Sequence, residues 1–412
     1  MLEQMGKNAK LASRQLSGLS TKQKNDALKL ISDELMLQKD KILSANAEDI
    51  KKAKDNGISD VMIDRLMLSD KRIEGMCSAI GELIALDDPV GEVISMTKRP
   101  NGLLIGQKRV PLGVVAIIFE SRPNVSVDAA TICLKTSNAV ILRGGKEAIN
   151  SNIALSEAMR DALKKAGLPR DAIQLIHDTS RDTATKLMRL NKYVDVLIPR
   201  GGAGLIRAVV DNANVPVIET GVGNCHVFID ETADFDMAVN ITDNAKTQRP
   251  SVCNAIESLL VHEKIAKEIL PLVDARLKEH NVEIRGCEKT CAILSDAKAA
   301  SDEDYYTEFQ GYILAVKVVS GIDEAIAHIN KYGSGHSECI ITESYKNSQK
   351  FLEDIDAAAV YVNASTRFTD GGEFGLGAEM GISTQKLHAR GPMGLCAMTS
   401  TKFIIYGDGQ IR

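Results

Sequence analysis

The sequence contains no tryptophan, only 4% aromatic residues and no excess of positive charge. Its formal net charge is -5, its pI is near 5.9, and no cluster of lysine and arginine alternates with aromatic residues. A nucleic-acid-binding surface is therefore not indicated. A long hydrophobic run is missing as well, since the longest apolar stretch, residues 110–119, is about half of what a membrane span requires. Residues 1–10 are too polar for a signal peptide, so we expect a cytoplasmic protein.

Cysteine occurs eight times, but without the pattern of a metal site or a disulfide framework. Only Cys287 and Cys291 lie close together, and no histidine stands at ligand spacing from them. We therefore expect reduced thiols and no bound metal. The 412 residues, 44% hydrophobic and 25% charged, suit a globular protein of two or three domains.

Residues 1–87 carry apolar side chains at helical spacing and predict a helical region. The pattern then changes over residues 90–108 to short runs around Asn101-Gly102, which is a strong hairpin signal. Because an exposed hairpin needs a pairing partner, we expect it to join the sheet edge of another subunit. Residues 402–406 are typical of an extended strand and are predicted to pair with this hairpin.

The rest of the chain alternates apolar and amphipathic segments in two series. The first predicts strands at 114–119, 139–143, 173–176, 194–198 and 217–218, and helices at 127–134, 149–166, 184–190 and 205–213. The second predicts strands at 259–261, 292–294, 314–319, 338–342 and 359–362, and helices at 265–279, 323–331 and 347–355. Strands rich in Val and Ile between helices indicate two α/β domains with parallel doubly wound sheets. Such sheets bind ligands beyond the carboxyl ends of their strands.

One cysteine has an informative context, the run Gln248-Arg249-Pro250-Ser251-Val252-Cys253. A helical turn that starts after Pro250 and Ser251 would present unpaired N–H groups and the positive end of a helix dipole to the thiol, which favours the thiolate. Only the thiolate is a good nucleophile. The alternative, a buried cysteine that acts as a small hydrophobic residue, is also compatible with this motif alone.

Glycine-rich loops follow two of the predicted strands. One contains Gly201 and Gly202 and leads into a helix, which suits an anion at the helix N-terminus. As a dinucleotide fingerprint it is imperfect, because Arg207 stands where the last small residue belongs, and a plain tight turn is the alternative. In the other loop Arg143 and Lys146 are candidates for a ribose or a 2′-phosphate, although Lys146 is also compatible with a solvated loop position. Two such loops on one sheet edge favour a dinucleotide site.

A third segment, residues 119–125, follows strand 114–119 and places Arg122 and Asn124 at the same edge. The Asn124 amide is a candidate donor to an oxyanion, and a helix N-cap before Val125 is the alternative. By residue type His177 and His226 are candidate bases. Because no partner is identifiable for either, we interpret both as structural.

A larger set of short motifs occurs in an order and spacing that is typical of one protein family. These motifs are Pro111-Leu112-Gly113-Val114-Val115, the Lys146 loop, residues 219–224, the Cys253 run, Glu308-Phe309-Gln310-Gly311 and Tyr332-Gly333-Ser334-Gly335. Over nearly its whole length the chain thereby resembles the aldehyde dehydrogenase superfamily. Residues 120–125, 331–338 and 370–375 look like the members that reduce L-glutamyl 5-phosphate in L-proline biosynthesis. The resemblance implies an α/β, aldehyde dehydrogenase-like fold of two doubly wound α/β domains plus a small β-hairpin oligomerisation element.

We expect three regions on this basis. The first is a dinucleotide-binding domain over residues 1–230, interrupted by the oligomerisation hairpin at about 92–110. The second is a catalytic thiol domain over residues 231–388. The third is a C-terminal strand, residues 389–412, that joins the oligomerisation element.

Residue roles follow from the resemblance position by position. Cys253 matches the superfamily's nucleophile, and Glu308 matches the acidic residue that holds the nicotinamide ribose. Lys146 matches the lysine that touches the adenosine ribose, which is compatible with NADPH. The other expected cofactor contacts are Arg143, Gly201, Gly202 and Phe309. Glu219 falls where hydrolytic relatives keep a base that activates water, but the Leu-Gly-Gly-Lys that follows in those relatives is absent here, so a catalytic role for Glu219 is left open.

The reaction expected from the resemblance is the NADPH-dependent reduction of L-glutamyl 5-phosphate to L-glutamate 5-semialdehyde with release of phosphate. Cys253 would form a thioester, and the Cys253 backbone N–H with Asn124 would stabilise the oxyanion. A substrate with a phosphate and an α-carboxylate also needs fixed cations. The candidates are Arg122, Arg249 and Arg367, each of which is also compatible with a surface or salt-bridge arginine.

Two other enzyme classes and a scaffold stay as alternatives. An acylating dehydrogenase that uses coenzyme A would need the same thiol and cofactor, whereas a cysteine hydrolase would need a histidine partner and no nicotinamide. A catalytically silent binding protein is disfavoured by the joint presence of Cys253, Lys146 and Glu308. We expect a homo-oligomer, and leave open both its size and an association with the upstream glutamate kinase.

Overall fold

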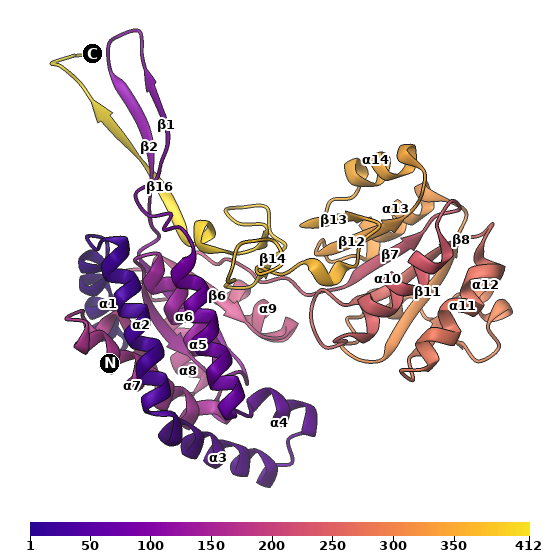
Figure 1. Ribbon diagram of the computed structural model, residues 1–412, viewed down its shortest axis with the longest axis horizontal. Coiled ribbons are helices and arrows are strands. Elements are labelled where there is room, and N and C mark those ends of the chain that lie inside the picture. The colour runs from indigo at the N-terminus through magenta and orange to yellow at the C-terminus, as the bar shows by residue number, and fades with distance from the viewer. The chain divides into compact units, whose positions relative to one another are not determined.

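The structure is a computed structural model that describes residues 1–59 and 62–412 completely and residues 60 and 61 by their backbone alone. The chain forms two compact units. The first unit comprises residues 1–220, 375–381 and 393–412, and the second comprises residues 221–374 and 382–392. Each contains a parallel sheet flanked by helices (Figure 1). No helix among the described residues is both long and apolar enough to cross a membrane.

Five helices open the first unit. They are α1 (Leu2–Leu16), α2 (Thr21–Leu37), α3 (Lys39–Asp55), α4 (Asp60–Leu66) and α5 (Asp70–Ala85). The start of α2 is fixed by a capping box, in which the Ser20 hydroxyl accepts from the Gln23 backbone N–H and the Gln23 side chain accepts in return from the Ser20 N–H. The buried face of α2 includes Ala27, Leu28 and Ile31, which confirms the helical pattern of this region.

The sheet of the first unit has four parallel strands in the order β5 (Ile173–Leu175), β4 (Ala139–Arg143), β3 (Val114–Phe119) and β6 (Val196–Arg200). All six residues of β3 are buried, as expected for a central strand covered on both faces. The other helices of the first unit are α6 (Asn124–Lys135), α7 (Ile149–Lys165), α8 (Arg181–Met188) and α9 (Ala203–Asn212), with short 3-10 turns at Lys146–Ala148, Arg170–Ala172 and Leu395–Met398. Predicted strand 217–218 is reduced to one bridge between Val217 and Leu197.

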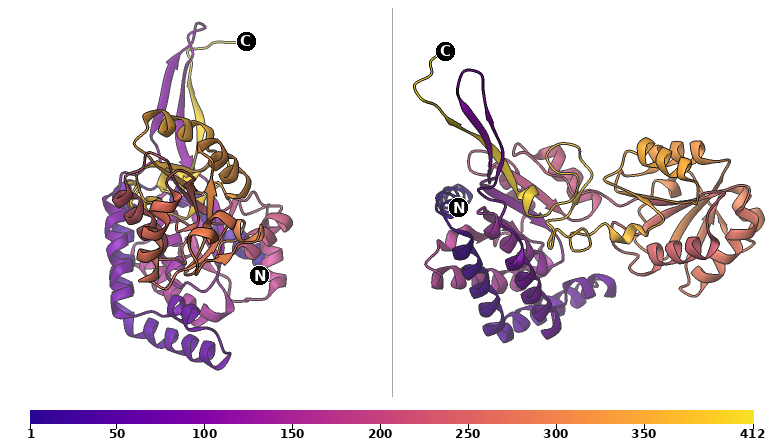
Figure 2. Two further views of the ribbon diagram at one scale, coloured as in Figure 1. Left: turned by 90° about the vertical axis from the view of Figure 1, so that its right-hand side faces the viewer. Right: turned by 45° about the horizontal axis from the view of Figure 1, so that its top comes forward.

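A separate antiparallel sheet of the first unit consists of β1 (Val93–Lys98), β2 (Leu104–Pro111) and the C-terminal β16 (Thr399–Tyr406). The strands extend together beyond the helices (Figures 1 and 2). The predicted hairpin and its pairing with the last strand are therefore confirmed. At the hairpin turn Gly102 has a positive φ of 89° and its N–H donates to the Arg99 carbonyl.

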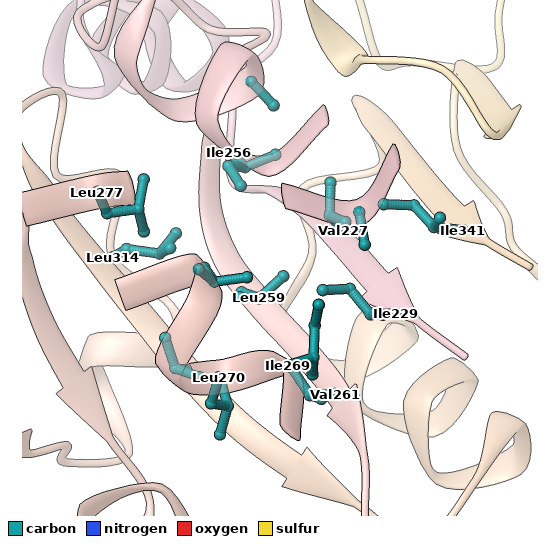
Figure 3. Close-up of a cluster of buried hydrophobic side chains, with 14 of the residues drawn as sticks. Val227, Ile229, Ile256, Leu259, Val261, Ile269, Leu270, Leu277, Leu314 and Ile341 are labelled. Atoms are coloured by element: carbon teal, nitrogen blue, oxygen red, sulfur yellow. The ribbon is translucent and has the colours of Figure 1, made fainter. Parts of the chain in front are cut away.

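The second unit contains a seven-stranded parallel sheet in the order β10 (Lys298–Ala299), β9 (Glu283–Gly286), β11 (Ile313–Val319), β8 (Ile256–His262), β7 (Cys225–Ile229), β12 (Ser337–Ile341) and β13 (Ala359–Val362). Its helices are α10 (Phe235–Thr247), α11 (Ala266–Lys278), α12 (Glu288–Ile293), α13 (Ile322–Tyr332) and α14 (Tyr345–Asp354), with 3-10 turns at Glu303–Tyr305 and Thr366–Phe368. A two-stranded ladder joins β14 (Ile382–Ser383) and β15 (Gly391–Pro392). Apolar residues of α11, such as Ile269, pack with apolar residues of β7, β8 and β11, such as Val227 and Leu259 (Figure 3).

Two expectations about this unit need correction. Residues 292–294 were expected to form a strand, but Ala292 and Ile293 end helix α12 and Leu294 is its C-cap. The units also divide after Thr220 and not after residue 230, because β7 pairs with β8 and β12 and so belongs to the second sheet. Residues 389–392 likewise belong to the second unit, since Gly391 and Pro392 pair with β14.

Candidate functional site

Three loops of the first unit leave the carboxyl ends of β3, β4 and β6, which are neighbours in the sheet. This edge brings together the predicted residues Arg122, Asn124, Arg143, Lys146, Gly201 and Gly202. The first two loops are joined directly, because the Ser121 N–H and hydroxyl donate to Glu147 Oε1 at 2.8 and 2.7 Å. Burial alone would raise the pKa of Glu147, but these hydrogen bonds and the nearby Arg143 hold it below its ordinary value.

Arg143 and Lys146 differ in their surroundings. Arg143 is half-buried, burial lowers the pKa of its guanidinium, and its Nη2 donates to the Thr179 carbonyl at 2.5 Å. Its buried Nε has no hydrogen-bond partner within the described part of the chain. An unsatisfied cationic donor fits a phosphate or ribose oxygen. Lys146 is exposed at the start of a 3-10 turn, and a ribose contact for it stays a prediction.

The backbone of the Gly201-Gly202 loop lies close to the side chain of Glu120. A Cβ at Gly201 would lie 2.3 Å from Glu120 Oε2, and the same oxygen accepts the Gly202 N–H at 3.0 Å. A Cβ at Gly202 would meet nothing within 4 Å, so the space beside it is open at the start of α9. One amide of the loop, the Gly202 N–H, is already bound to a carboxylate. The cofactor contacts of Gly201 and Gly202 stay predictions.

Asn124 is not the helix N-cap. It is the first residue of α6, whose N-cap is Pro123 without a side-chain cap hydrogen bond. The Asn124 Nδ2 donates to Asp128 Oδ2 at 3.0 Å, one turn further along the helix. Burial raises the pKa of Asp128 to about 6, while the Asn124 hydrogen bond and the Arg200 charge oppose the rise. The Asn124 amide therefore has a fixed orientation with a second N–H to offer, and its oxyanion role stays a prediction.

In the second unit Cys253 lies in a turn between α10 and β8. No helix starts at Cys253 among these described residues, so the expected contribution of a helix dipole to the thiolate is wrong. The turn is closed by the Ala255 N–H, which donates to the Val252 carbonyl at 3.1 Å. The thiol is half-buried, which distinguishes it from the fully buried Cys225 and Cys339. Burial raises the pKa of Cys225 well above its ordinary value and that of Cys339 to about 12.

Gly223 packs directly against the Cys253 turn. A Cβ on Gly223 would lie 1.7 Å from the Cys253 carbonyl oxygen and 2.4 Å from its Cα. That carbonyl oxygen also accepts from Cys225 Sγ at 3.1 Å. The segment that enters β7 thus forms one wall of the turn, and only glycine permits this approach.

Arg367 is the cation whose charge interacts with Cys253. Burial lowers the pKa of the Arg367 guanidinium, the charge of Arg249 lowers it further, and Cys253 acts in the opposite direction. Arg367 Nε donates to Gln248 Oε1 at 2.9 Å, and Arg367 Nη1 donates to Asn254 Oδ1. Arg249 is exposed, whereas Arg367 is half-buried. The charge of Arg367 therefore interacts with those of both Arg249 and Cys253.

Glu308 lies beside the same wall. Its Oε1 accepts the Gly223 N–H at 2.9 Å, and its Oε2 accepts from Gln310 Nε2 at 3.1 Å. Each oxygen keeps a lone pair, which suits the hydroxyls of a ribose. Phe309 follows in this loop, with the Arg285 guanidinium carbon 5.2 Å from its ring centroid.

These residues of the second unit stand before their strands, not after them. Gly223 precedes β7, Cys253 precedes β8 and Glu308 precedes β11. The predicted site residues of the first unit therefore follow the carboxyl ends of their strands, whereas those of the second unit lie at the amino ends. Sequence reasoning also missed Asn254, which is buried and donates from Nδ2 to the Thr369 carbonyl at 2.9 Å. Its position next to Cys253 was an available signal.

His226 has the partner that the sequence did not reveal. Its ring is fully buried in β7, and Nδ1 lies 3.0 Å from Glu338 Oε2 in the adjacent strand. The Glu338 carboxylate also accepts the His226 backbone N–H at 2.8 Å. These contacts favour the structural interpretation of His226. A catalytic base at this position would require access that the burial denies.

Comparisons with known proteins assign the family. The family model described as the aldehyde dehydrogenase family matches residues 2–293 and 290–404. The chain belongs to this family. It is 63% identical over 407 residues to the gamma-glutamyl phosphate reductase of Clostridium perfringens, an alignment that covers 99% of this chain and 98% of that protein. The fold and oxidoreductase class expected from the resemblance are thereby confirmed.

Solved structures of the aldehyde dehydrogenase fold agree with this. The crystal structure of gamma-glutamyl phosphate reductase from Thermotoga maritima is similar with a TM-score of 0.98 and 52% identity, and covers 100% of this chain and 99% of that one. An engineered glycolyl-CoA reductase with bound NADP+ shares the fold, with a TM-score of 0.70 and 17% identity over 98% of this chain and 96% of that one.

Proposed function

We propose that this member of the aldehyde dehydrogenase family reduces L-glutamyl 5-phosphate to L-glutamate 5-semialdehyde with NADPH and releases phosphate, in L-proline biosynthesis. The name of the 63% identical relative supports the substrate. The observation that carries the proposal is a half-buried thiol, Cys253, whose charge interacts with that of Arg367, which in turn interacts with Arg249.

The sulfur of Cys253 attacks the acyl carbon, the bond from that carbon to the phosphate oxygen breaks, and phosphate leaves with the electron pair. The product on the enzyme is a thioester, which accepts hydride far more readily than a carboxylate does. When bound, NADPH supplies that hydride. Collapse of the resulting tetrahedral species releases the aldehyde and returns the electron pair to Cys253. Asn124 and the Cys253 backbone N–H are the proposed donors to the oxyanion.

Guanidinium groups near the thiol serve two purposes in this scheme. Positive charge stabilises the thiolate before attack, and it binds the phosphate and the α-carboxylate of the substrate. We assign Arg249, Arg367 and Arg122 to these anions. The guanidinium of Arg367 is fixed by both Gln248 and Asn254.

The cofactor assignment rests on several residues. Glu308 offers a carboxylate with both oxygens oriented, and Phe309 follows it. Arg143 has an unpartnered buried Nε within the described chain, and Lys146 is exposed nearby in sequence. The glycolyl-CoA reductase of the same fold has NADP+ bound, which is compatible with NADPH here.

The test is the reverse reaction on purified protein. L-glutamate 5-semialdehyde, NADP+ and phosphate are combined, and NADPH absorbance is followed. Activity that does not depend on phosphate would overturn the acyl phosphate assignment, and activity with coenzyme A in its place would favour the acylating dehydrogenase. Loss of turnover in Cys253→Ala with intact NADPH binding is expected, whereas retained turnover would refute the thioester.

We also propose that copies of the chain associate through the sheet of β1, β2 and β16. Large apolar side chains are exposed on it, among them Phe403 at 69% and Ile405 at 59%. Edge strands with such side chains favour pairing with another chain. Association with the upstream kinase stays a prediction, which co-elution of the two purified proteins would check.

A further inference from the structure

A buried ion pair connects the start of β8 to the loop that carries Glu308. Lys246 and Glu257 have fully buried side chains, and Lys246 Nζ lies 2.5 Å from Glu257 Oε2. Lys246 Nζ also donates to the Ile256 carbonyl at 3.0 Å. The other carboxylate oxygen, Glu257 Oε1, accepts the backbone N–H of Gln310 at 3.0 Å. The ion pair therefore fixes Glu257 Oε2, while Glu257 Oε1 binds the backbone of the loop that carries Glu308.

Gln310 connects Glu257 to Glu308. Its φ of 53° lies in the left-handed region, which costs free energy for a residue other than glycine and persists only where the surroundings enforce it. Its side-chain amide donates to Glu308 Oε2 at 3.1 Å. A chain of contacts thus runs from Lys246 through Glu257 and Gln310 to the carboxylate of Glu308.

The ion pair is not explained by stability alone. Two buried charges are often no more stabilising than apolar residues of the same volume, because both must be removed from water. Burial indeed raises the pKa of Glu257 to about 7, against the opposing charge of Lys246. Two apolar residues in place of Lys246 and Glu257 could not accept a hydrogen bond from the Gln310 N–H.

We propose that Glu257, fixed by Lys246, is a positioning residue for Glu308: it holds Gln310 in its left-handed conformation and so sets the carboxylate that binds the nicotinamide ribose. Glu257 itself touches neither substrate nor cofactor in this scheme. The inference rests on the proposed role of Glu308 toward NADPH.

Two matched double variants isolate the acceptor. Lys246→Met with Glu257→Gln removes both charges but keeps an amide oxygen that can accept from Gln310. Lys246→Met with Glu257→Met removes both charges and the acceptor together. Neither variant leaves an unpaired buried charge, so both are expected to fold, which circular dichroism and urea unfolding check.

The readouts are the Kd of NADPH, from its fluorescence, and the burst of phosphate released by acylation of Cys253 without cofactor. We expect the Met/Met variant to bind NADPH about tenfold more weakly than the Met/Gln variant, with equal phosphate bursts. Equal Kd values in the two would overturn the inference, and so would a loss confined to the burst.

A third variant separates this inference from the function on which it rests. Glu308→Ala should weaken NADPH binding at least as much as the Met/Met pair. If Glu308→Ala leaves the Kd unchanged, the proposed role of Glu308 fails. If it weakens binding while the two double variants remain alike, only the positioning role of Glu257 fails. Adding Glu308→Ala to the Met/Met variant should cause no loss beyond that of Glu308→Ala alone, because residues that act through one another are not additive.

Discussion

Replacement of Gly223 by alanine is expected to reduce kcat/KM of the phosphate-dependent reverse reaction by at least about 100-fold. The new Cβ would lie 1.7 Å from the Cys253 carbonyl oxygen. Because heavy atoms in van der Waals contact need about 3.5 Å, the Gly223 segment and the Cys253 turn must separate by more than about 1 Å. A displacement of about 1 Å at a reacting atom costs on the order of 100-fold in rate. Overpacking of this kind also costs about 1–3 kcal/mol of stability.

The assay for Gly223→Ala combines initial rates with urea unfolding, so that lost activity is compared with lost stability. The matched control is Gly81→Ala in α5, where a Cβ would meet nothing within 4 Å. This control should keep its activity and gain about 0.5–1 kcal/mol, since alanine is the better helix former. Because the Gly223 N–H also binds Glu308, the phosphate burst without cofactor is measured too. A Gly223→Ala protein with a normal burst and normal kcat/KM would refute the close-packing argument.

Three further predictions concern other parts of the chain. Burial raises the pKa of Asp128 from its ordinary value of 3.8 to about 6, so the folded state holds this proton more tightly. The stability that the proton contributes is full below about pH 4 and is lost as the pH rises through about 6. Asp128→Asn should therefore gain roughly 2 kcal/mol over the parent at pH 8 relative to pH 4 in urea unfolding, and parallel pH profiles would contradict this. Arg367→Ala should raise the KM for phosphate in the reverse assay about tenfold or more, and Arg367→Lys should not restore it, because lysine lacks the planar fork; full rescue by lysine would show that charge alone suffices. Phe403→Lys with Ile405→Lys should lower the mass measured by light scattering without loss of the fold, and an unchanged mass would exclude this sheet as the association surface.

Periodicity predicted most of the sheet architecture. Strands such as β3 are central and buried on both faces, so their apolar runs are unambiguous. The failure at residues 292–294 has a physical cause, because short apolar runs do not distinguish a strand from the end of a helix. Leu294 is buried as the C-cap of α12, in which an apolar residue fits as well as it would in a strand. Strand β7 was missed because Cys225 and His226 break the Val and Ile pattern, although both are fully buried.

The site was harder to predict because its geometry depends on contacts that are distant in sequence. Glu257 and Gln310, or Gly223 and Glu308, meet only through the parallel arrangement of β7, β8 and β11. No local pattern marks a glutamate in an apolar strand as the partner of a lysine on the preceding helix. The residue types of the site were predicted from the family resemblance, whereas the contacts that orient them required the fold.

The structure changes the proposed source of activation for the Cys253 thiol. A helix N-terminus would supply about half a positive charge to Cys253, but the turn before β8 has no such helix. In the proposed mechanism Arg249 and Arg367 supply formal charges instead; burial and the Arg249 charge lower the pKa of Arg367, whereas Cys253 raises it. Because Arg367 is half-buried and tied to Gln248 and Asn254, its charge is less screened than that of an exposed arginine. In the proposed mechanism the guanidinium of Arg367 would both stabilise the thiolate and bind the anionic substrate, so that activation of the nucleophile and recognition of the acyl phosphate would depend on one cation.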